Sequence, residues 1–99
     1  MLYVIMATDV PDSAAKRATT RPDHLKYIAR LIDDGRLLLA GAHPAIDSPD
    51  PGPAGMSGSL IVAEFESMKD AEAWAANDPY STEGVFESVF IKPFLKVHP

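Results

Sequence analysis

Apolar side chains occupy consecutive positions at the start of the chain instead of alternating with polar ones. In a strand formed by residues 2–8, LYVIMAT, apolar side chains would point to both faces: Leu2, Val4 and Met6 to one, Tyr3, Ile5 and Ala7 to the other. Strands with two apolar faces are typical of places where both faces are covered. We therefore expect residues 2–8 to form a strand that is buried on both faces.

From about residue 20, the apolar spacing changes to that of a helix. Four apolar side chains follow the i, i+3, i+4, i+7 rule of an amphipathic helix: Leu25, Ile28, Ala29 and Ile32. Thr20 or Asp23 can cap the start of this helix, and Pro22 is tolerated in a first turn. Gly35 suits the position that ends it. The pattern predicts a loop over residues 8–20, followed by the helix.

Three further segments have the composition of β-strands: residues 36–42, 59–65 and 84–94. Residues 43–58, between the first two, are rich in proline and glycine, which predicts one long loop. Loops of this length in small domains are usually functional or mobile. Pro93 cannot donate a hydrogen bond to a neighbouring strand, so the last strand should end there or lie at an edge of the sheet.

Residues 67–78 carry the signals of a second helix. Ser67 stands at the N-cap position, with Asp70 three residues later, as in a capping box. Its apolar stripe consists of Met68, Ala71, Trp74 and Ala75. Asp78 stands at the end of this helix and precedes Pro79, which does not continue it.

The order of these elements, βαββαβ, predicts an α+β, ferredoxin-like domain: a four-stranded antiparallel sheet with two helices on one face. Following the chain through this fold places the start of the first helix and the end of the second at the same edge of the sheet. The predicted loops and the connection after residue 78 reach that edge as well. The irregular segments of the chain therefore gather there.

Two ionisable side chains, His24 and Asp78, come to this edge from distant parts of the sequence. A histidine can take up or release a proton near neutral pH, and a carboxylate can fix its tautomer. The pair is a candidate general-base dyad. Structural interpretations remain for both: a histidine on a helix surface, and an aspartate that forms the turn before Pro79. A metal site that adds His43 to the pair is a further alternative.

The composition of the chain limits the classes of partner that it is expected to bind. The chain has 99 residues, a formal net charge of −5 and no cysteine. The negative charge and the lack of a basic cluster argue against nucleic acid and anionic membranes as partners. The apolar N-terminal run is short for a signal or membrane segment. We expect one cytoplasmic domain over residues 1–99, in which an exposed apolar sheet face would favour association with a second copy.

Six stretches resemble the YciI-like family, small proteins of the dimeric α+β barrel group: YVIMATDVP, RPDHL, LLLAGAHPAID, GMSGSLIVAEF, AEAWAANDPY and GVFESVFIKPFLKV. The resemblance implies a ferredoxin-like protomer whose sheet packs against that of a second protomer, as a homodimer. It also implies that the family's active-site pair, a histidine in the first helix and the aspartate of DPY, falls on His24 and Asp78. Many members carry another residue in place of His43, which weakens the metal interpretation.

These observations lead to a hypothesis of an enzyme that needs no cofactor or metal. His24 would move a proton on a small hydroxylated or ring-shaped substrate, in lyase, dehydrochlorinase or isomerase chemistry, and Asp78 would orient it. Arg21, Ser59 and Tyr80 would line the pocket. The alternative is a non-catalytic module that binds a small metabolite or dimerises as an accessory to an enzyme.

Overall fold

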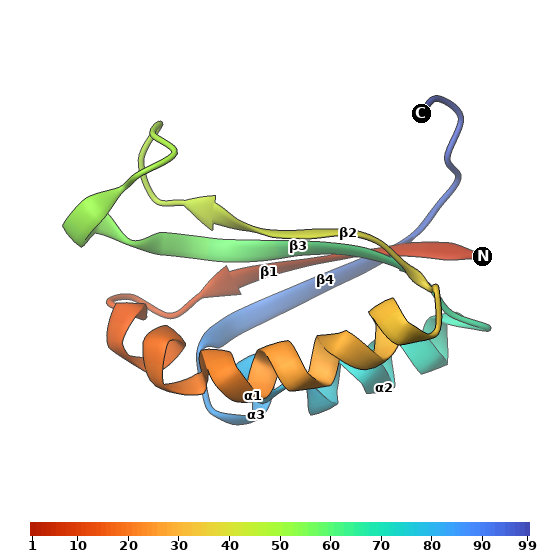
Figure 1. The fold of residues 1–99 in the computed structure, drawn as a ribbon, viewed down its shortest axis with the longest axis horizontal. Helices are drawn as coiled ribbons and strands as arrows, with labels where there is room; N and C mark the ends of the chain where they lie inside the picture. Colours follow the sequence, from red (N-terminus) through yellow and green to blue (C-terminus); the bar gives the residue numbers. More distant parts are fainter.

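Four antiparallel strands form one sheet in the order β2-β3-β1-β4, and the helices pack on one of its faces (Figure 1). The computed structural model describes all residues, 1–99. Its elements are β1 (Leu2–Asp9), α1 (Ala14–Asp33), β2 (Leu37–Pro44), η1 (Gly52–Ala54), β3 (Met56–Glu64), α2 (Met68–Asn77), α3 (Pro79–Thr82) and β4 (Phe86–Phe94). The predicted ferredoxin-like α+β fold is confirmed, with η1 and α3 as short additions.

The core lies between the sheet and the helices. Residues directly opposite each other in an antiparallel pair share a face, so Ile5 of β1 and Ile61 of β3 both point toward the helices. The core cluster consists of Tyr3, Ile5, Ile28, Leu31, Ile61, Ala63, Phe65, Ala71 and Ala75. Of the stripe predicted for the first helix, Ile28 is buried as expected, whereas Leu25 and Ile32 are exposed. They border a cleft instead of the core.

The other face of the sheet is open. Along β1 the buried positions alternate with less buried ones, and Met6 on the open face is exposed. The prediction that the first strand is buried on both faces is therefore wrong for a single chain. The helices cover one apolar face of the strand, and no other element of the chain covers the second (Figure 1).

The first helix begins at Ala14, not near residue 20 as predicted. Pro22, which was expected in the first turn, lies inside the helix. An interior proline removes one backbone hydrogen bond and commonly kinks a helix, and Figure 1 shows that the first turns of α1 run in a different direction from the rest. His24 therefore lies in the middle of the helix. No helix of this chain combines the length and apolar character needed to cross a membrane.

The remaining boundaries are close to those predicted, with two differences. β2 and β3 extend further than expected, so the loop between them covers residues 45–55 and contains η1. A separate short helix, α3, follows α2 where only a connection was predicted. The N-cap of α2 is as expected, since Ser67 Oγ accepts the N–H of Asp70 at 3.1 Å. β4, which contains Pro93, lies at an edge of the sheet, as predicted.

Candidate active site

His24 and Asp78 meet where α1 passes the junction between α2 and α3. Nδ1 of His24 lies 2.8 Å from Oδ1 of Asp78, a hydrogen-bonding distance. Both side chains are sheltered from water, with 12% of the His24 side chain and 1% of the Asp78 side chain exposed. The structure thus places the two candidate residues in contact, and their role in catalysis stays a prediction.

The same oxygen of Asp78 also caps a helix. Asp78 has an extended backbone between α2 and α3, and its Oδ1 accepts the backbone N–H of Tyr80 at 2.9 Å. A side chain that accepts this N–H is an N-cap, and Pro79 occupies the first position of α3, which favours a helix start. The turn role of Asp78 and its contact with His24 therefore coexist and use one atom.

The contact with Asp78 determines which nitrogen of the imidazole is available. A carboxylate only accepts hydrogen bonds, so Nδ1 of His24 carries the hydrogen that it donates. In the neutral ring, Nε2 then holds the lone pair, and it forms no hydrogen bond within the protein. His24 lines a cleft on the helix side of the sheet. A molecule bound in that cleft would therefore lie beside the His24 ring.

Tyr80 packs against the imidazole. The rings of Tyr80 and His24 are stacked, and Tyr80 is buried. The guanidinium carbon of Arg17 lies 4.8 Å from the centre of the Tyr80 ring. Burial raises the pKa of Tyr80 above its ordinary value. The charges of Arg17 and Arg21 oppose this rise in pKa.

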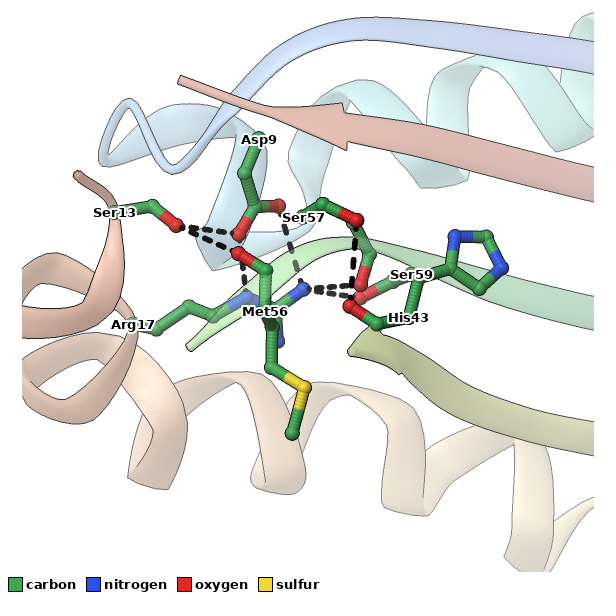
Figure 2. Close-up of polar contacts among 8 residues, drawn as sticks. Asp9, Ser13, Arg17, His43, Met56, Ser57 and Ser59 are labelled. Atoms are coloured by element: carbon green, nitrogen blue, oxygen red, sulfur yellow. Dashed lines mark hydrogen bonds and ion pairs between the residues drawn. The ribbon is translucent and has the colours of Figure 1, made fainter. Parts of the chain in front are cut away.

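Arg17 is held in place by a polar network at the end of β1 (Figure 2). Its Nε donates to Oδ2 of Asp9 at 2.6 Å, and Ser13 Oγ donates to the same oxygen at 2.7 Å. Nη2 of Arg17 donates to Ser59 Oγ at 2.5 Å. The same nitrogen donates to the carbonyl of Gly58 at 2.9 Å. The network joins the end of β1, the first turns of α1 and the start of β3.

The sequence-based prediction did not include Asp9 or Arg17, because it placed both in a loop. With the helix beginning at Ala14, the positions of Arg17, Arg21 and His24 are related as i, i+4 and i+7. Residues with this spacing share one face of a helix. This spacing was therefore present in the sequence. The prediction missed it because it placed Pro22 in the first turn of the helix, which left Arg17 in a loop.

The cleft has a volume of about 340 Å³ and lies between α1 and the strands β2 and β3. The predicted pocket residues Arg21, Ser59 and Tyr80 all line it, beside His24. Its remaining lining consists of Arg17 and of apolar or small residues: Leu25, Ile28, Ile32, Leu37, Ala40, Gly41, Ala42 and Ile61. One end of the cleft is thus polar and basic, and the rest is apolar, as in many sites for small organic ligands.

Two other features are less suited to catalysis. A larger and more open hollow, of about 600 Å³, lies elsewhere on the surface, beside Met1 and Trp74, and has no histidine in its lining. His43 pairs with Gly58 in the sheet and does not join the dyad. No group of three or more metal-ligating side chains is assembled in this chain, so the alternative site of His24, His43 and Asp78 is not formed.

Comparisons with known proteins place this geometry in context. The family model of the YCII-related domain matches residues 1–95. The chain is 57% identical over 97 residues to protein YciI of Escherichia coli, which covers 98% of this chain and 99% of that protein. It is 46% identical over 97 residues to an uncharacterized protein of Haemophilus influenzae, again covering 98% of this chain and 99% of that protein.

One solved structure has the same fold over nearly its whole length. It is the 5-chloro-2-hydroxyhydroquinone dehydrochlorinase of Burkholderia phenoliruptrix, in complex with 2,5-dihydroxybenzoquinone. The TM-score is 0.84 at 24% sequence identity, and the match covers 96% of this chain and 94% of that one. This likeness concerns the fold.

Proposed function

Since the chain belongs to the YCII-related domain family, we propose that it is a cofactor-independent enzyme that moves a proton on a small hydroxylated or ring-shaped substrate. His24 acts as the general base and Asp78 orients it. The observation that carries the proposal is the 2.8 Å contact from Nδ1 of His24 to Oδ1 of Asp78, because it leaves Nε2 free beside a cleft.

Each part of this pair has a defined task. Nε2 of His24 takes a proton from the substrate and becomes part of an imidazolium ion. The negative charge of Asp78 stabilises that ion and keeps the ring in one orientation, as third groups do for other catalytic imidazoles. General-base catalysis of this kind typically contributes about 10²–10⁴-fold to a rate. The lyase or isomerase class needs no more than such a base and a cleft that limits water.

The shape of the cleft supports a small substrate with an apolar part. A volume of about 340 Å³ lies at the lower end of the range for ligand pockets, and most of its wall is apolar. The solved dehydrochlorinase with the same fold binds a dihydroxybenzoquinone, which is a compound of this size and kind. We carry over the class of ring compounds, without a specific substrate.

We also propose that the protein is a homodimer whose two sheets face each other. Four large apolar side chains are exposed at open-face positions, on three of the four strands: Met6, Leu39, Phe90 and Phe94. Exposed apolar side chains gathered on one face of a sheet usually mark an interface. Lys92 lies on the same face, between Phe90 and Phe94. A second copy of the same face would cover it and would bury the remaining face of β1.

A substrate screen with a matched variant tests the enzymatic proposal. Chlorinated and hydroxylated aromatic compounds and lactones are offered to the wild type and to His24→Ala. We expect turnover of at least one compound by the wild type, and none by the variant. Equal turnover by His24→Ala contradicts the role of His24. Compounds that bind without being converted would support the alternative, a metabolite-binding module.

The tautomer of His24 gives a second and independent test. Long-range proton–nitrogen correlation spectra, recorded at a pH where the ring is neutral, report which nitrogen carries the hydrogen. We expect the hydrogen on Nδ1 in the wild type, because Asp78 accepts it. A ring protonated on Nε2 contradicts the proposed base, since the lone pair would then point away from the cleft.

A further inference from the structure

We propose that the cleft binds molecules with an oxygen that carries negative charge or develops it during the reaction, and that Arg17 and Arg21 hold this oxygen next to the carbon whose proton His24 moves. This inference deepens the proposed function and depends on it for the role of His24. The binding of an anion by the two arginines does not depend on it.

The charged groups that line the cleft have one sign. They are Arg17 and Arg21, which lie beside the neutral ring of His24, and no carboxylate lines the cleft. This is unexpected for a chain with 14 acidic and 9 basic side chains. Asp9, which holds Arg17, and Asp78, which holds His24, have side chains that are 2% and 1% exposed. A bound molecule therefore meets positive charge, while the compensating negative charge lies buried in the protein.

The guanidinium of Arg17 retains hydrogen-bond donors that a ligand can use. Its Nε and Nη2 are engaged by Asp9, Gly58 and Ser59, which leaves Nη1 as the donor for a ligand. A hydrogen bond from Arg17 to the Tyr80 side chain also lowers the pKa of Tyr80, against the rise that burial causes. The ion pair with Asp9 fixes the plane of the guanidinium, and 12% of the Arg17 side chain remains exposed. A donor that is already oriented loses little conformational entropy when it binds an anion.

Arg21 is a second cation with no protein partner. It stands one helical turn after Arg17 on the same face of α1, and it forms no ion pair or side-chain hydrogen bond. It lines the cleft with Arg17 and Tyr80, and its charge opposes the rise in the pKa of Tyr80. An unpaired guanidinium beside a cleft is suited to carboxylate, enolate or phenolate oxygens.

The arrangement fits removal of a proton from a carbon next to a carbonyl group. Nε2 of His24 takes the proton, and the electron pair of the broken C–H bond forms a C=C bond. The π pair of the carbonyl moves to its oxygen, which becomes the negative oxygen of an enolate. Return of the proton to another carbon completes an isomerisation, whereas departure of a leaving group with its electron pair completes an elimination. In both cases a fixed cation at the oxygen stabilises the charge as it develops.

Two probes of the same shape test the inference by binding alone. Benzoate is an anion and benzamide is neutral, and calorimetry measures the affinity of each for the wild type. We expect benzoate to bind roughly tenfold or more tightly than benzamide, as one or two charge-assisted hydrogen bonds would give. Added salt should weaken the binding of benzoate and leave that of benzamide unchanged.

Variants identify the residues responsible. Arg21→Gln should weaken benzoate binding roughly tenfold, whereas Arg30→Gln, on the same helix but outside the cleft, should not change it. Arg17→Gln alone would leave the buried Asp9 unpaired, so the double variant Asp9→Asn/Arg17→Gln is used, and thermal unfolding verifies that it folds. This double variant should also lose the preference for benzoate.

Anion binding by the arginines and proton transfer by His24 are tested separately, and either can be wrong without the other. His24→Ala should lose turnover and keep its binding of benzoate, because the arginines remain. The inference is overturned if benzoate does not bind, if it binds no better than benzamide, or if Arg30→Gln weakens binding as much as Arg21→Gln does. None of these results concerns proton transfer by His24.

Discussion

The rings of His24 and Tyr80 lie nearly parallel, with centroids 4.0 Å apart and 12° between their planes. One oxygen of Asp78 holds both residues, since it accepts from the His24 ring and from the backbone of Tyr80. The imidazole is therefore fixed by a hydrogen bond at its edge and by a ring against its face. The position of the proposed base depends on the short helix α3, which Asp78 caps.

Removal of the stacked ring should cost stability. Tyr80→Phe keeps the stack, and we expect its free energy of unfolding to stay within about 1 kcal/mol of the wild type. Tyr80→Leu loses the stack and should lose about 1–2 kcal/mol more. Urea unfolding measures both. An equal loss in the two variants would mean that the stack with His24 contributes nothing.

The pH dependence of stability should also involve Tyr80. Burial raises the pKa of this tyrosine above its ordinary value of 10.0 in the folded chain, so the folded state holds its proton more firmly than the unfolded state does. The stabilisation is complete below pH 10 and is lost as the pH rises through the folded pKa. Tyr80→Phe should reduce this alkaline loss in part, because burial raises the pKa of Tyr27 as well. Unfolding curves from pH 8 to pH 11 follow the effect, and an unchanged pH slope in the variant contradicts it.

Two substitutions separate the capping role of Asp78 from its proposed role in catalysis. Asp78→Asn keeps an oxygen that can cap α3, so the stability should change little, while the loss of charge beside His24 should abolish most of the activity. Asp78→Ala also loses the cap and should unfold about 1 kcal/mol more easily than Asp78→Asn. Denaturant unfolding and a turnover assay measure the two roles. Full activity in Asp78→Asn would leave Asp78 as a capping residue only.

Gly58 should tolerate no side chain. A Cβ at this position would collide with the backbone carbonyl oxygen of Ala7 in the neighbouring strand. We expect Gly58→Ala to lower the free energy of unfolding by about 1–3 kcal/mol, as overpacking does. Gly41→Ala is the matched control, since Gly41 lies in β2 with open space where its Cβ would be. Similar stability of the two variants would show that the strands can move apart at no cost.

The open face of the sheet should determine the oligomeric state. Phe90 lies on this face and Ile46 lies in the loop after β2, and both residues are 52% exposed in one chain. Phe90→Lys should convert the proposed dimer to a monomer, whereas Ile46→Lys should not. Sedimentation equilibrium gives the mass of each. A wild-type chain that is monomeric at high concentration contradicts the dimer.

Most of the fold was predictable because hydrophobic periodicity reports which face of an element is buried. The βαββαβ order, the cap at Ser67 and the edge position of the strand with Pro93 followed from local patterns. The start of α1 did not, because proline at position 22 is usually a start signal, and here it lies inside the helix. The predicted boundary left Arg17 in a loop, and Arg17 was therefore missing from the predicted site.

Other parts of the site depend on tertiary contacts that local patterns do not encode. Asp9 was expected to lie in a loop and is instead buried against Ser13 and Arg17. The stacking of Tyr80 on His24 requires α3, a helix of four residues that is too short to show periodicity. The sharing of one Asp78 oxygen between a cap and a histidine is visible only in three dimensions.

The separation of His24 and Asp78 by 54 positions has a consequence for folding. His24 belongs to the first βαβ half of the chain and Asp78 to the second, and contacts between distant segments form slowly because closing a long loop loses entropy. The strands of the two halves alternate in the sheet, with β3 between β2 and β1, so neither half forms its part of the sheet alone. Recovery of turnover during refolding should therefore coincide with assembly of the whole sheet.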